Sequence, residues 1–422
     1  MEKIEEVIKS SKQKLGEKIP CSIEILTPVH IGSGVKLANG IDFTATRDTV
    51  TIVPQSVLMD YLEDNPDQLE KFIQSGYKLD RINVSEIGKK YPINRDRVFD
   101  IAEFERNGFG KPYIPGSSIK GAIRTILLRK RFNELSPNEQ TNLLKQVNST
   151  KKEWASEPIV KKLLGDSSNE NLMRALEIFD AEFNEVSLEK VLILSLSNNE
   201  ATAYKWKKMG QEAMNQDDPS RATSIFVEAL PIGAKGYSSI SLSKFLFNNP
   251  EAKQQLKFSE PSLSSIESFV KTINNYSLEK LNKEKAFFQK LNSSKKLNEL
   301  LKNIDTLITE TSKLQKDEII LRLSWGSGWK GMTGDYLDDN WLSIFRKKYG
   351  GRQGMGKTEF KIFPKTRRIV FEDNIPKYLT GWIKIKLNDK PSSKEPEEKR
   401  DEQQDPMELL KQKFKVIETK KK

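Results

Sequence analysis

The stretch Lys111–Phe132, KPYIPGSSIKGAIRTILLRKRF, carries the clearest fold signal in the chain. Its proline–glycine pair predicts a turn, and the hydroxyl of Ser117 or Ser118 can cap a helix that begins near Ile119. Apolar residues then recur three and four positions apart, which predicts one stripe that faces a core: Ile119, Ala122, Ile123, Ile126 and Leu127. The stretch therefore predicts a capped, half-buried helix directly after a tight turn.

Two interpretations of this helix remain open from spacing alone. In the first, it is an ordinary amphipathic core helix with a good cap. In the second, its N-terminus holds an anion, because unpaired backbone N–H groups and the positive end of the helix dipole lie beside serine hydroxyls and Lys120. Arg124 follows one turn later, off the apolar stripe. Gly121 costs about 1 kcal/mol relative to alanine in a helix, which favours a close approach by another backbone or a ligand.

The composition favours a polyanionic partner. Among 422 residues, 70 Lys and Arg stand against 59 Asp and Glu, a formal net charge of +11. Such an excess attracts phosphate backbones, although a lysine-rich surface that serves only solubility has the same composition. The single cysteine, Cys21, and the single histidine, His30, exclude a disulfide framework and a zinc site of the usual Cys/His kind. The charged first residues and the lack of an apolar run of membrane length predict a soluble, cytoplasmic protein.

Strand and helix patterns alternate along the rest of the chain, which predicts an α+β fold. Strands are predicted within residues 21–34, 41–54, 175–183, 190–197, 221–243 (with a turn at 231–236), 359–363 and 381–387. Helices are predicted within residues 56–76, interrupted at Pro66, and within the lysine-rich stretch 244–316. We expect one module over residues 1–185, a second over 186–388, and a disordered charged tail over 389–422.

Residues 351–358, GRQGMGKT, match the nucleotide-binding P-loop pattern letter for letter. That site requires a buried strand before the loop and a helix after it, so that the helix N-terminus supports the phosphates. Here residues 338–349 have a helical pattern, and residues 359–372 alternate like a strand. We therefore predict a basic loop that contacts a phosphate backbone, and not an ATPase site.

Six segments, in this order, resemble those of RAMP-type Cas proteins. They are TPVHIGSG (27–34), YIPGSSIKGAIR (113–124), EIFDAEF (177–183), FVEALPIGAKGYSSISL (226–242), LSWGSGWKGMTGDY (323–336) and GMGKTEFKIFPKTRRI (354–369). The last two narrow the resemblance to the family of fifth subunits of type III-A (Csm) CRISPR effector complexes, over about Ile23 to Leu387. The resemblance implies two ferredoxin-like (RRM-like) modules with glycine-rich loops and helical insertions.

The function that this resemblance implies is that of a noncatalytic, RNA-binding structural subunit without a cofactor. Such a subunit caps the 3′ end of the crRNA and supports crRNA maturation and antiviral defence. Its implied partners are crRNA and the backbone and other subunits of the Csm complex, with host nucleases as a further class. No membrane partner is expected.

Carried over residue by residue, the motifs imply a set of RNA contacts. The positions are Gly116, Ser117, Ser118, Lys120, Gly121 and Arg124, then Lys330, Arg352 and Lys357 in the C-terminal glycine loops, with His30, Gly32, Ser33 and Gly34 as further loop contacts. The aromatic residues that stack bases in ordinary RRMs are not recognisable in this chain, which favours recognition of backbone and shape over base readout.

An enzymatic alternative stays open, a RAMP endoribonuclease that processes crRNA precursors. His30 beside a glycine turn can act as its general acid or base, whereas the plainer interpretation is a histidine that hydrogen-bonds its own turn. A second candidate for this enzyme is an acidic turn with three carboxylates that could bind a metal ion, Asp335, Asp338 and Asp339. Such turns are usually only solvated. Asp180 is expected to orient a loop or to contact a neighbouring subunit.

Overall fold

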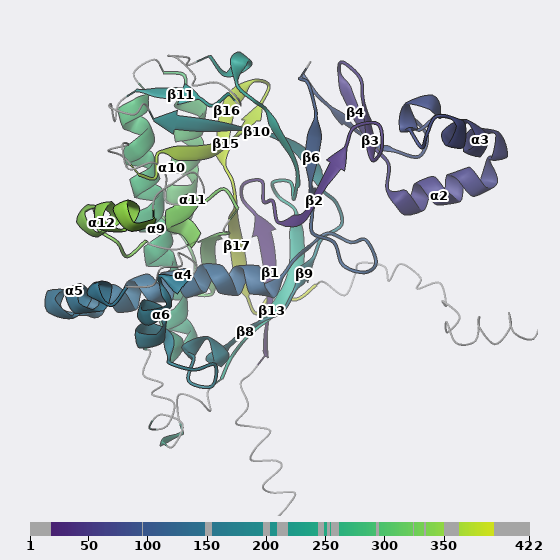
Figure 1. Cartoon of the computed structure of the whole chain (residues 1–422). Coiled ribbons are helices and arrows are strands. Elements are labelled where there is room, and N and C mark those ends of the chain that lie inside the picture. Colours follow the sequence, from purple (N-terminus) through teal and green to yellow (C-terminus); the bar gives the residue numbers. More distant parts are fainter. Residues whose placement is uncertain are drawn as a thin grey trace, which may run out of the picture.

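The computed structural model shows two large sheets with long helices beside them (Figure 1). The structure describes residues 18–94, 96–147, 154–196, 203–208, 218–243, 249–250, 254, 261–292, 295–323, 325–332, 335–349 and 363–391. Within these ranges the strands form two seven-stranded sheets and one three-stranded sheet. The α+β class that the sequence predicts is confirmed.

The first sheet has the strand order of a ferredoxin-like module. Its order is β14 (Glu318–Arg322), β17 (Trp382–Leu387), β1 (Lys18–Ile25), β13 (Lys235–Leu242), β9 (Ala181–Glu182) and β7 (Tyr113–Ile114), with β8 (Leu176–Ile178) also paired to β13. All of these pairs are antiparallel. Helix α4 (Gly116–Glu134) lies in sequence between β1 and β8, and α9 (Ile266–Leu291) lies between β13 and β17, which gives the split β-α-β connectivity of this fold.

The second sheet, like part of the first, packs against helix α9. Its order is β16 (Ile375–Leu379), β15 (Thr366–Glu372), β10 (Ser187–Leu196), β12 (Ile225–Ala229), β6 (Asp100–Phe104) and β2 (Gly32–Ala38), with β11 (Tyr204–Trp206) paired to β10. Strands β6 and β12 run parallel, and the other pairs run antiparallel. Helix α10 (Asn298–Ser312) packs on α9 and on β16, so the two helices share one core with strands of both sheets.

Both sheets contain strands from both halves of the chain. Strands β1, β7, β8 and β9 precede residue 186 and share a sheet with β13, β14 and β17, whereas β2 and β6 share the other sheet with β10 and β12. The expected boundary between residues 185 and 186 therefore runs through both sheets. The turn predicted at residues 231–236 does join two strands, β12 and β13, but these enter different sheets.

Helix α4 buries its predicted apolar stripe against the first sheet. The five stripe residues are between 0 and 7% exposed, and the stripe continues to Leu128 and Phe132. Full burial of a large apolar side chain contributes about 1.5–3 kcal/mol, so this face fixes the position of the helix. The opposite face carries Lys120, Gly121 and Arg124, which are exposed or half-buried.

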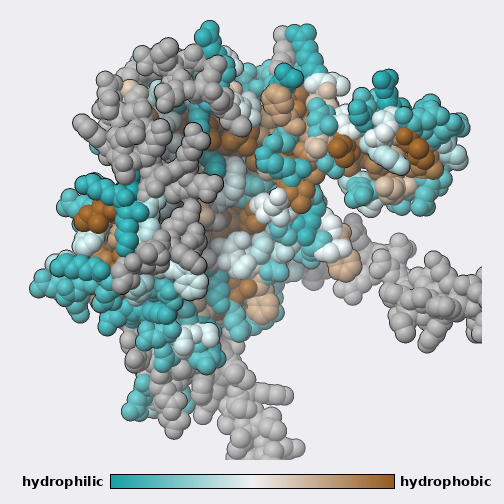
Figure 2. All heavy atoms as spheres, in the orientation of Figure 1, coloured by the Kyte–Doolittle hydropathy of each residue, from teal (hydrophilic) through white to brown (hydrophobic). Residues whose placement is uncertain are grey.

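A smaller lobe projects from the second sheet, at the right of Figure 1. It consists of β3 (Phe43–Ala45), β4 (Thr49–Ile52), α2 (Gln55–Asp64), α3 (Pro66–Gln74), η1 (Leu79–Arg81) and β5 (Lys89–Pro92). The predicted hairpin over residues 41–54 is confirmed as the antiparallel β3–β4 pair, and the predicted helix interruption falls at Pro66, the first residue of α3. Figure 2 shows hydrophobic atoms on the surface of this lobe.

The remaining elements are short. They are α5 (Pro137–Lys145), α6 (Glu157–Leu164), η3 (Leu172–Ala175), η4 (Pro219–Arg221), η5 (Pro261–Leu263), α11 (Gly328–Met332) and α12 (Asp339–Tyr349). Across the ranges described above, every helix is too short or too polar to cross a membrane. The predicted strand at residues 359–363, apart from Phe363, lies outside the described residues. So does the predicted charged tail over 389–422, apart from residues 389–391.

Candidate nucleic-acid interface

Helix α4 begins at Gly116, earlier than the sequence predicts. Pro115 precedes it in an extended conformation, and no side chain of the N-cap residue caps the helix, so the predicted serine cap near Ile119 was wrong. The backbone N–H of Gly116 instead donates a hydrogen bond to Oδ1 of Asp180, at 2.7 Å. The carboxylate of Asp180, 64 positions further along the chain, therefore supplies the negative charge that the positive end of the helix dipole favours.

Gly116 is buried because the helix meets the β8–β9 segment at this point. A Cβ atom placed on Gly116 would lie 2.0 Å from the carbonyl oxygen of Ile178, a separation that no real side chain tolerates. The glycine is thus required by packing between two parts of the fold. Of the motif residues in this first turn, Ser117 is exposed and Ser118 is half-buried, so these two remain open to a ligand.

The polar face of α4 is more open in its second turn. Lys120 is half-buried, and within the described part of the chain no hydrogen bond or ion pair engages its ammonium group. Gly121 is exposed, and a Cβ atom placed on it would meet nothing within 4 Å. Arg124 lies near Tyr336, whose pKa burial raises to about 12 against the opposing effect of the Arg124 charge. On this face Lys120 and Arg124 therefore lie on the two sides of Gly121, whose backbone no side chain covers.

The glycine loop that contains Lys330 lies beside this helix. The hydroxyl of Thr125 on α4 is 3.3 Å from the carbonyl oxygen of Met332, and α11 packs directly on α4. Gly326 and Gly328 adopt φ values of +82° and +77°, a left-handed conformation that favours glycine and lets the chain turn sharply toward the helix. The structure thus brings Lys330 and the α4 motif together, although some two hundred residues separate them in sequence.

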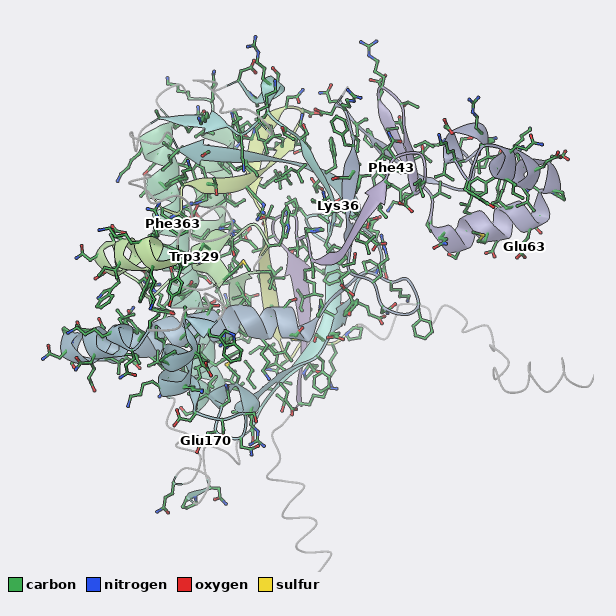
Figure 3. The ribbon with its side chains drawn as sticks, viewed as in Figure 1. Lys36, Phe43, Glu63, Glu170, Trp329 and Phe363 are labelled. Atoms are coloured by element: carbon green, nitrogen blue, oxygen red, sulfur yellow. The ribbon has the colours of Figure 1, made fainter. Side chains whose placement is uncertain are left out.

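Two further predicted contacts, Arg352 and Lys357, lie outside the described residues. The flanks of their loop are described in part. Helix α12 precedes the loop and strand β15 follows it, which is the reverse of the strand–loop–helix order of a P-loop. Near the start of this second flank, the rings of Trp329 and Phe363 lie 5.4 Å apart, next to each other in Figure 3.

A group of charged side chains behind the glycine loop was not recognised in the sequence. Asp335 binds both Arg129 and Lys280, and it also accepts a hydrogen bond from the hydroxyl of Tyr276 at 3.0 Å. A second bridge joins Arg367 to Glu284, with Nε 2.8 and 3.0 Å from the two carboxylate oxygens. Lys280 and Glu284 lie in the stretch 244–316, for which the sequence predicts only a lysine-rich helix. No local pattern therefore distinguishes them from the other charged residues of that helix.

The pKa values in this group follow from burial and from charge. Burial alone raises the pKa of Glu279, but hydrogen bonds from Arg129 and Lys283 lower it to about 2. Burial lowers the pKa of Arg322 to about 10, because desolvation outweighs the attraction of Glu284. The guanidinium stays charged at neutral pH and donates hydrogen bonds to the carbonyl oxygens of Thr380 and Gly326, at 2.9 and 3.2 Å.

His30 is buried, with 3% of its surface exposed. The plainer interpretation from the sequence, a hydrogen bond to its own turn, was wrong. Its Nδ1 donates to the backbone carbonyl of Glu228 on β12 at 2.6 Å, and its ring lies edge-on to Trp325. Burial lowers its pKa. The imidazole is therefore a packed, neutral group below the surface, and a contact of His30 with RNA stays a prediction that this burial does not favour.

The glycine turn after His30 remains at the surface. Gly32 and Gly34 are exposed at the start of β2, and the hydroxyl of half-buried Ser33 donates to Oε2 of Glu103 at 2.7 Å. Gly34 has φ of +91°. These three predicted loop contacts are accessible, but the structure places them on the second sheet, on a different element from α4.

The acidic turn has structural partners. The side chain of Asp335 is 4% exposed and is held by two cations, as described above. Asp338 accepts a hydrogen bond from the backbone N–H of Trp341 at 2.8 Å, in the first turn of α12. Over the residues that the structure describes, no three His, Cys, Asp or Glu side chains are grouped so that they could hold a metal ion.

Comparison with protein families finds the RAMP superfamily model over residues 22–332. Among curated proteins, the chain is 38% identical over 85 residues to a Streptococcus thermophilus protein described as CRISPR system Cms protein Csm5. That alignment covers 19% of this chain and 23% of the relative, so it spans less than a quarter of the relative's length.

Two solved structures share the fold over most of the chain. One is a chain of a Csm–crRNA–target RNA ternary complex of a type III-A CRISPR-Cas system, determined by cryo-EM, with 20% identity and a TM-score of 0.59. The alignment covers 87% of this chain and 100% of the chain from that complex. The other is the crystal structure of T. onnurineus Csm5, with 18% identity, a TM-score of 0.54, and coverage of 86% and 99%.

Proposed function

The chain belongs to the RAMP superfamily, and on that premise we propose that it is a structural RNA-binding subunit of a type III-A CRISPR (Csm) ribonucleoprotein. In this proposal it caps the 3′ end of the crRNA in the cytoplasm and supports crRNA maturation and antiviral defence. Its partners are crRNA, the neighbouring backbone and other subunits of the complex, and host nucleases that trim the crRNA. The likeness in fold to Csm5 and to a chain of a Csm–crRNA complex supports this proposal.

The observation that carries the proposal is the open polar face of α4. Lys120 and Arg124 lie one turn apart on either side of Gly121, whose backbone has free space beside it, and Lys330 comes from helix α11, which packs on the same helix. Lysine and arginine around exposed backbone suit the phosphates of an RNA strand, because each neutralised phosphate releases a counterion. The formal net charge of +11 adds long-range attraction of the same sign.

The subunit is proposed to be noncatalytic. Metal-independent RNA cleavage commonly uses an accessible general acid or base, and the single histidine of the chain is buried with a lowered pKa. This burial argues against the role of general acid or base that the endoribonuclease alternative gives to His30. We expect no cleavage when the purified protein is incubated with labelled repeat RNA, with or without EDTA.

The test removes the two α4 cations together, in the double variant Lys120→Ala, Arg124→Ala. Both residues lie off the buried stripe, and alanine is a good helix former, so folding should survive. Charged hydrogen bonds contribute about 1.5–3 kcal/mol each, so the loss of two should lower RNA affinity by roughly a hundredfold or more. For single-stranded RNA, the slope of log K against log salt should flatten by about 1.4, at about 0.7 per lost phosphate contact.

A matched control removes two exposed lysines of α10 and its C-cap, in the variant Lys302→Ala, Lys313→Ala. This change has the same effect on net charge, so any larger loss in the α4 variant is local. In complexes purified through another subunit, the α4 variant should show reduced occupancy and altered crRNA 3′ ends. Unchanged occupancy, unchanged 3′ ends and an affinity equal to that of the control would refute the proposal.

A further inference from the structure

A cavity of about 210 Å³ lies behind the glycine loop. It is bounded by α4, α9 and α11 and by residues of β14, β15 and β17. Trp382, 1% exposed, and half-buried Arg322 line its inner part, whereas the side chain of Lys283 is 60% exposed and marks its approach from solvent. Lys120 and Arg124 do not line it, although Lys330, the third cation of the proposed RNA-binding face, does.

The walls of this cavity carry an excess of positive charge. Its lining includes five cations, Lys280, Lys283, Arg322, Lys330 and Arg367, and one carboxylate, Glu284. The ion pairs of these lysines add two carboxylates, Glu279 and Asp335, and one more cation, Arg129, which contacts both. Six cations thus meet three carboxylates among the described residues, an excess of three positive charges. An enclosed space with this balance favours an anionic occupant.

The cavity wall also contains a buried donor without an acceptor. Trp382 is 1% exposed, and its indole Nε1 has no hydrogen-bond partner among the residues that the structure describes. Buried donors are nearly always paired, so an unpaired one in a cavity wall indicates a missing acceptor. The guanidinium of Arg322 lies 5.8 Å from the centre of the same ring, which adds a cation next to the unpaired donor.

Two further lining residues are aromatic. Phe287 and Tyr276 are half-buried in the lining, and the guanidinium of Arg367 lies 4.3 Å from the centre of the Phe287 ring. Aromatic rings and guanidinium planes are the surfaces on which proteins stack nucleobases. Pockets for drug-sized ligands measure about 300–1,000 Å³, so this smaller cavity suits a ligand no larger than one nucleotide.

We propose that the cavity binds a single phosphate-bearing nucleotide, with its phosphate near Lys330 and its base against the aromatic wall. The phosphate supplies the negative charge that the wall lacks and acceptor oxygens for unpaired donors. This inference goes beyond the proposed function, because it concerns a cavity that the α4 cations do not line. The nucleotide is either free or one unit of an RNA strand, and both sources share this chemistry.

The test is calorimetric titration of the full chain with AMP, adenosine and inorganic phosphate. AMP should bind at least tenfold more tightly than either of the other two, since only AMP engages both the cations and the aromatic wall. Trp382→Phe keeps the ring and removes the indole N–H, and Lys330→Ala removes one cation. Each variant should weaken AMP binding roughly tenfold. Lys302→Ala, an exposed change on α10, should leave it unchanged.

Several outcomes overturn the inference. These are no AMP binding at millimolar concentration, equal binding of AMP and adenosine, equal binding of AMP and phosphate, or AMP binding that neither variant weakens. Should Trp382→Phe fail to fold, Lys330→Ala decides alone, because Lys330 is a half-buried side chain of the short helix α11.

Competition identifies the source of the nucleotide and separates this inference from the RNA-binding proposal. Displacement of AMP by a five-nucleotide RNA supports a nucleotide within a strand, and simultaneous binding supports a free nucleotide. The variant Lys120→Ala, Arg124→Ala should retain wild-type AMP affinity whether or not it binds RNA. Loss of AMP binding in that variant overturns the assignment of the cavity.

Discussion

The two glycines of helix α4 have opposite surroundings. Gly116 is buried, and a Cβ atom there would lie 2.0 Å from the carbonyl oxygen of Ile178. Gly121, five residues later, is exposed and has nothing within 4 Å of the same position. Packing therefore explains the first glycine completely and the second not at all. One short motif thus combines a residue needed for the fold with a residue that costs stability and leaves backbone open to a ligand.

The largest effect is expected from Gly116→Ala. The new methyl group must displace the backbone of the β8–β9 segment, and overpacking of this kind costs typically about 1–3 kcal/mol, more where backbone must move. We expect the free energy of unfolding to fall by about 3 kcal/mol, measured by urea denaturation. Ser117→Ala, at the exposed neighbouring position, is the control and should change it by less than about 0.5 kcal/mol. A stable Gly116→Ala protein would contradict the packing explanation.

A smaller effect is expected from Asp180, which holds the same end of the helix. Asp180→Ala removes the acceptor for the Gly116 N–H and a carboxylate at the positive end of the helix dipole. Loss of an N-terminal cap costs typically about 1 kcal/mol, and we expect the free energy of unfolding to fall by that amount.

Asp180→Asn separates the two contributions, because it keeps an acceptor oxygen and removes the charge. It should lose only about 0.3–1 kcal/mol, the usual value of a charge near a helix terminus, and this loss should shrink at high salt. If Asp180→Asn and Asp180→Ala behave alike, the hydrogen bond contributes nothing and the carboxylate acts by charge alone.

The sequence predicted the parts of the molecule that depend on local pattern. The apolar stripe of α4, the hairpin at β3–β4 and the helix interruption at Pro66 follow from residue periodicity and from proline geometry, and all three are confirmed. The start of α4 was wrong because the group that satisfies Gly116 comes from Asp180, which local spacing cannot reveal. Whether the motif residues touch RNA stays a prediction.

Features built from distant segments could not be read from the sequence. Arg322, Arg367 and Lys280 come from β14, β15 and α9, and only the folded topology gathers them around one cavity. The same holds for the sheets, in which β1 pairs with β13 and β17, so a boundary drawn along the chain at residue 185 cuts both sheets. Strand pairing over such separations leaves no periodic signal in either partner.

The smallest expected effect, and the one that tests the comparison most sharply, is that of Gly121→Ala. Alanine is more favourable than glycine in a helix interior by roughly 0.5–1 kcal/mol, and the new methyl group meets open space. The free energy of unfolding should therefore rise by about that amount, opposite in sign to Gly116→Ala. RNA affinity should fall a few-fold, because the methyl group keeps a phosphate from the backbone while Lys120 and Arg124 remain in place. Urea denaturation and RNA titration of the same preparation measure both quantities. A variant that is more stable and binds RNA as tightly as the wild type would show that the open backbone at Gly121 is not part of the RNA-binding face, and would leave the two cations to act without it.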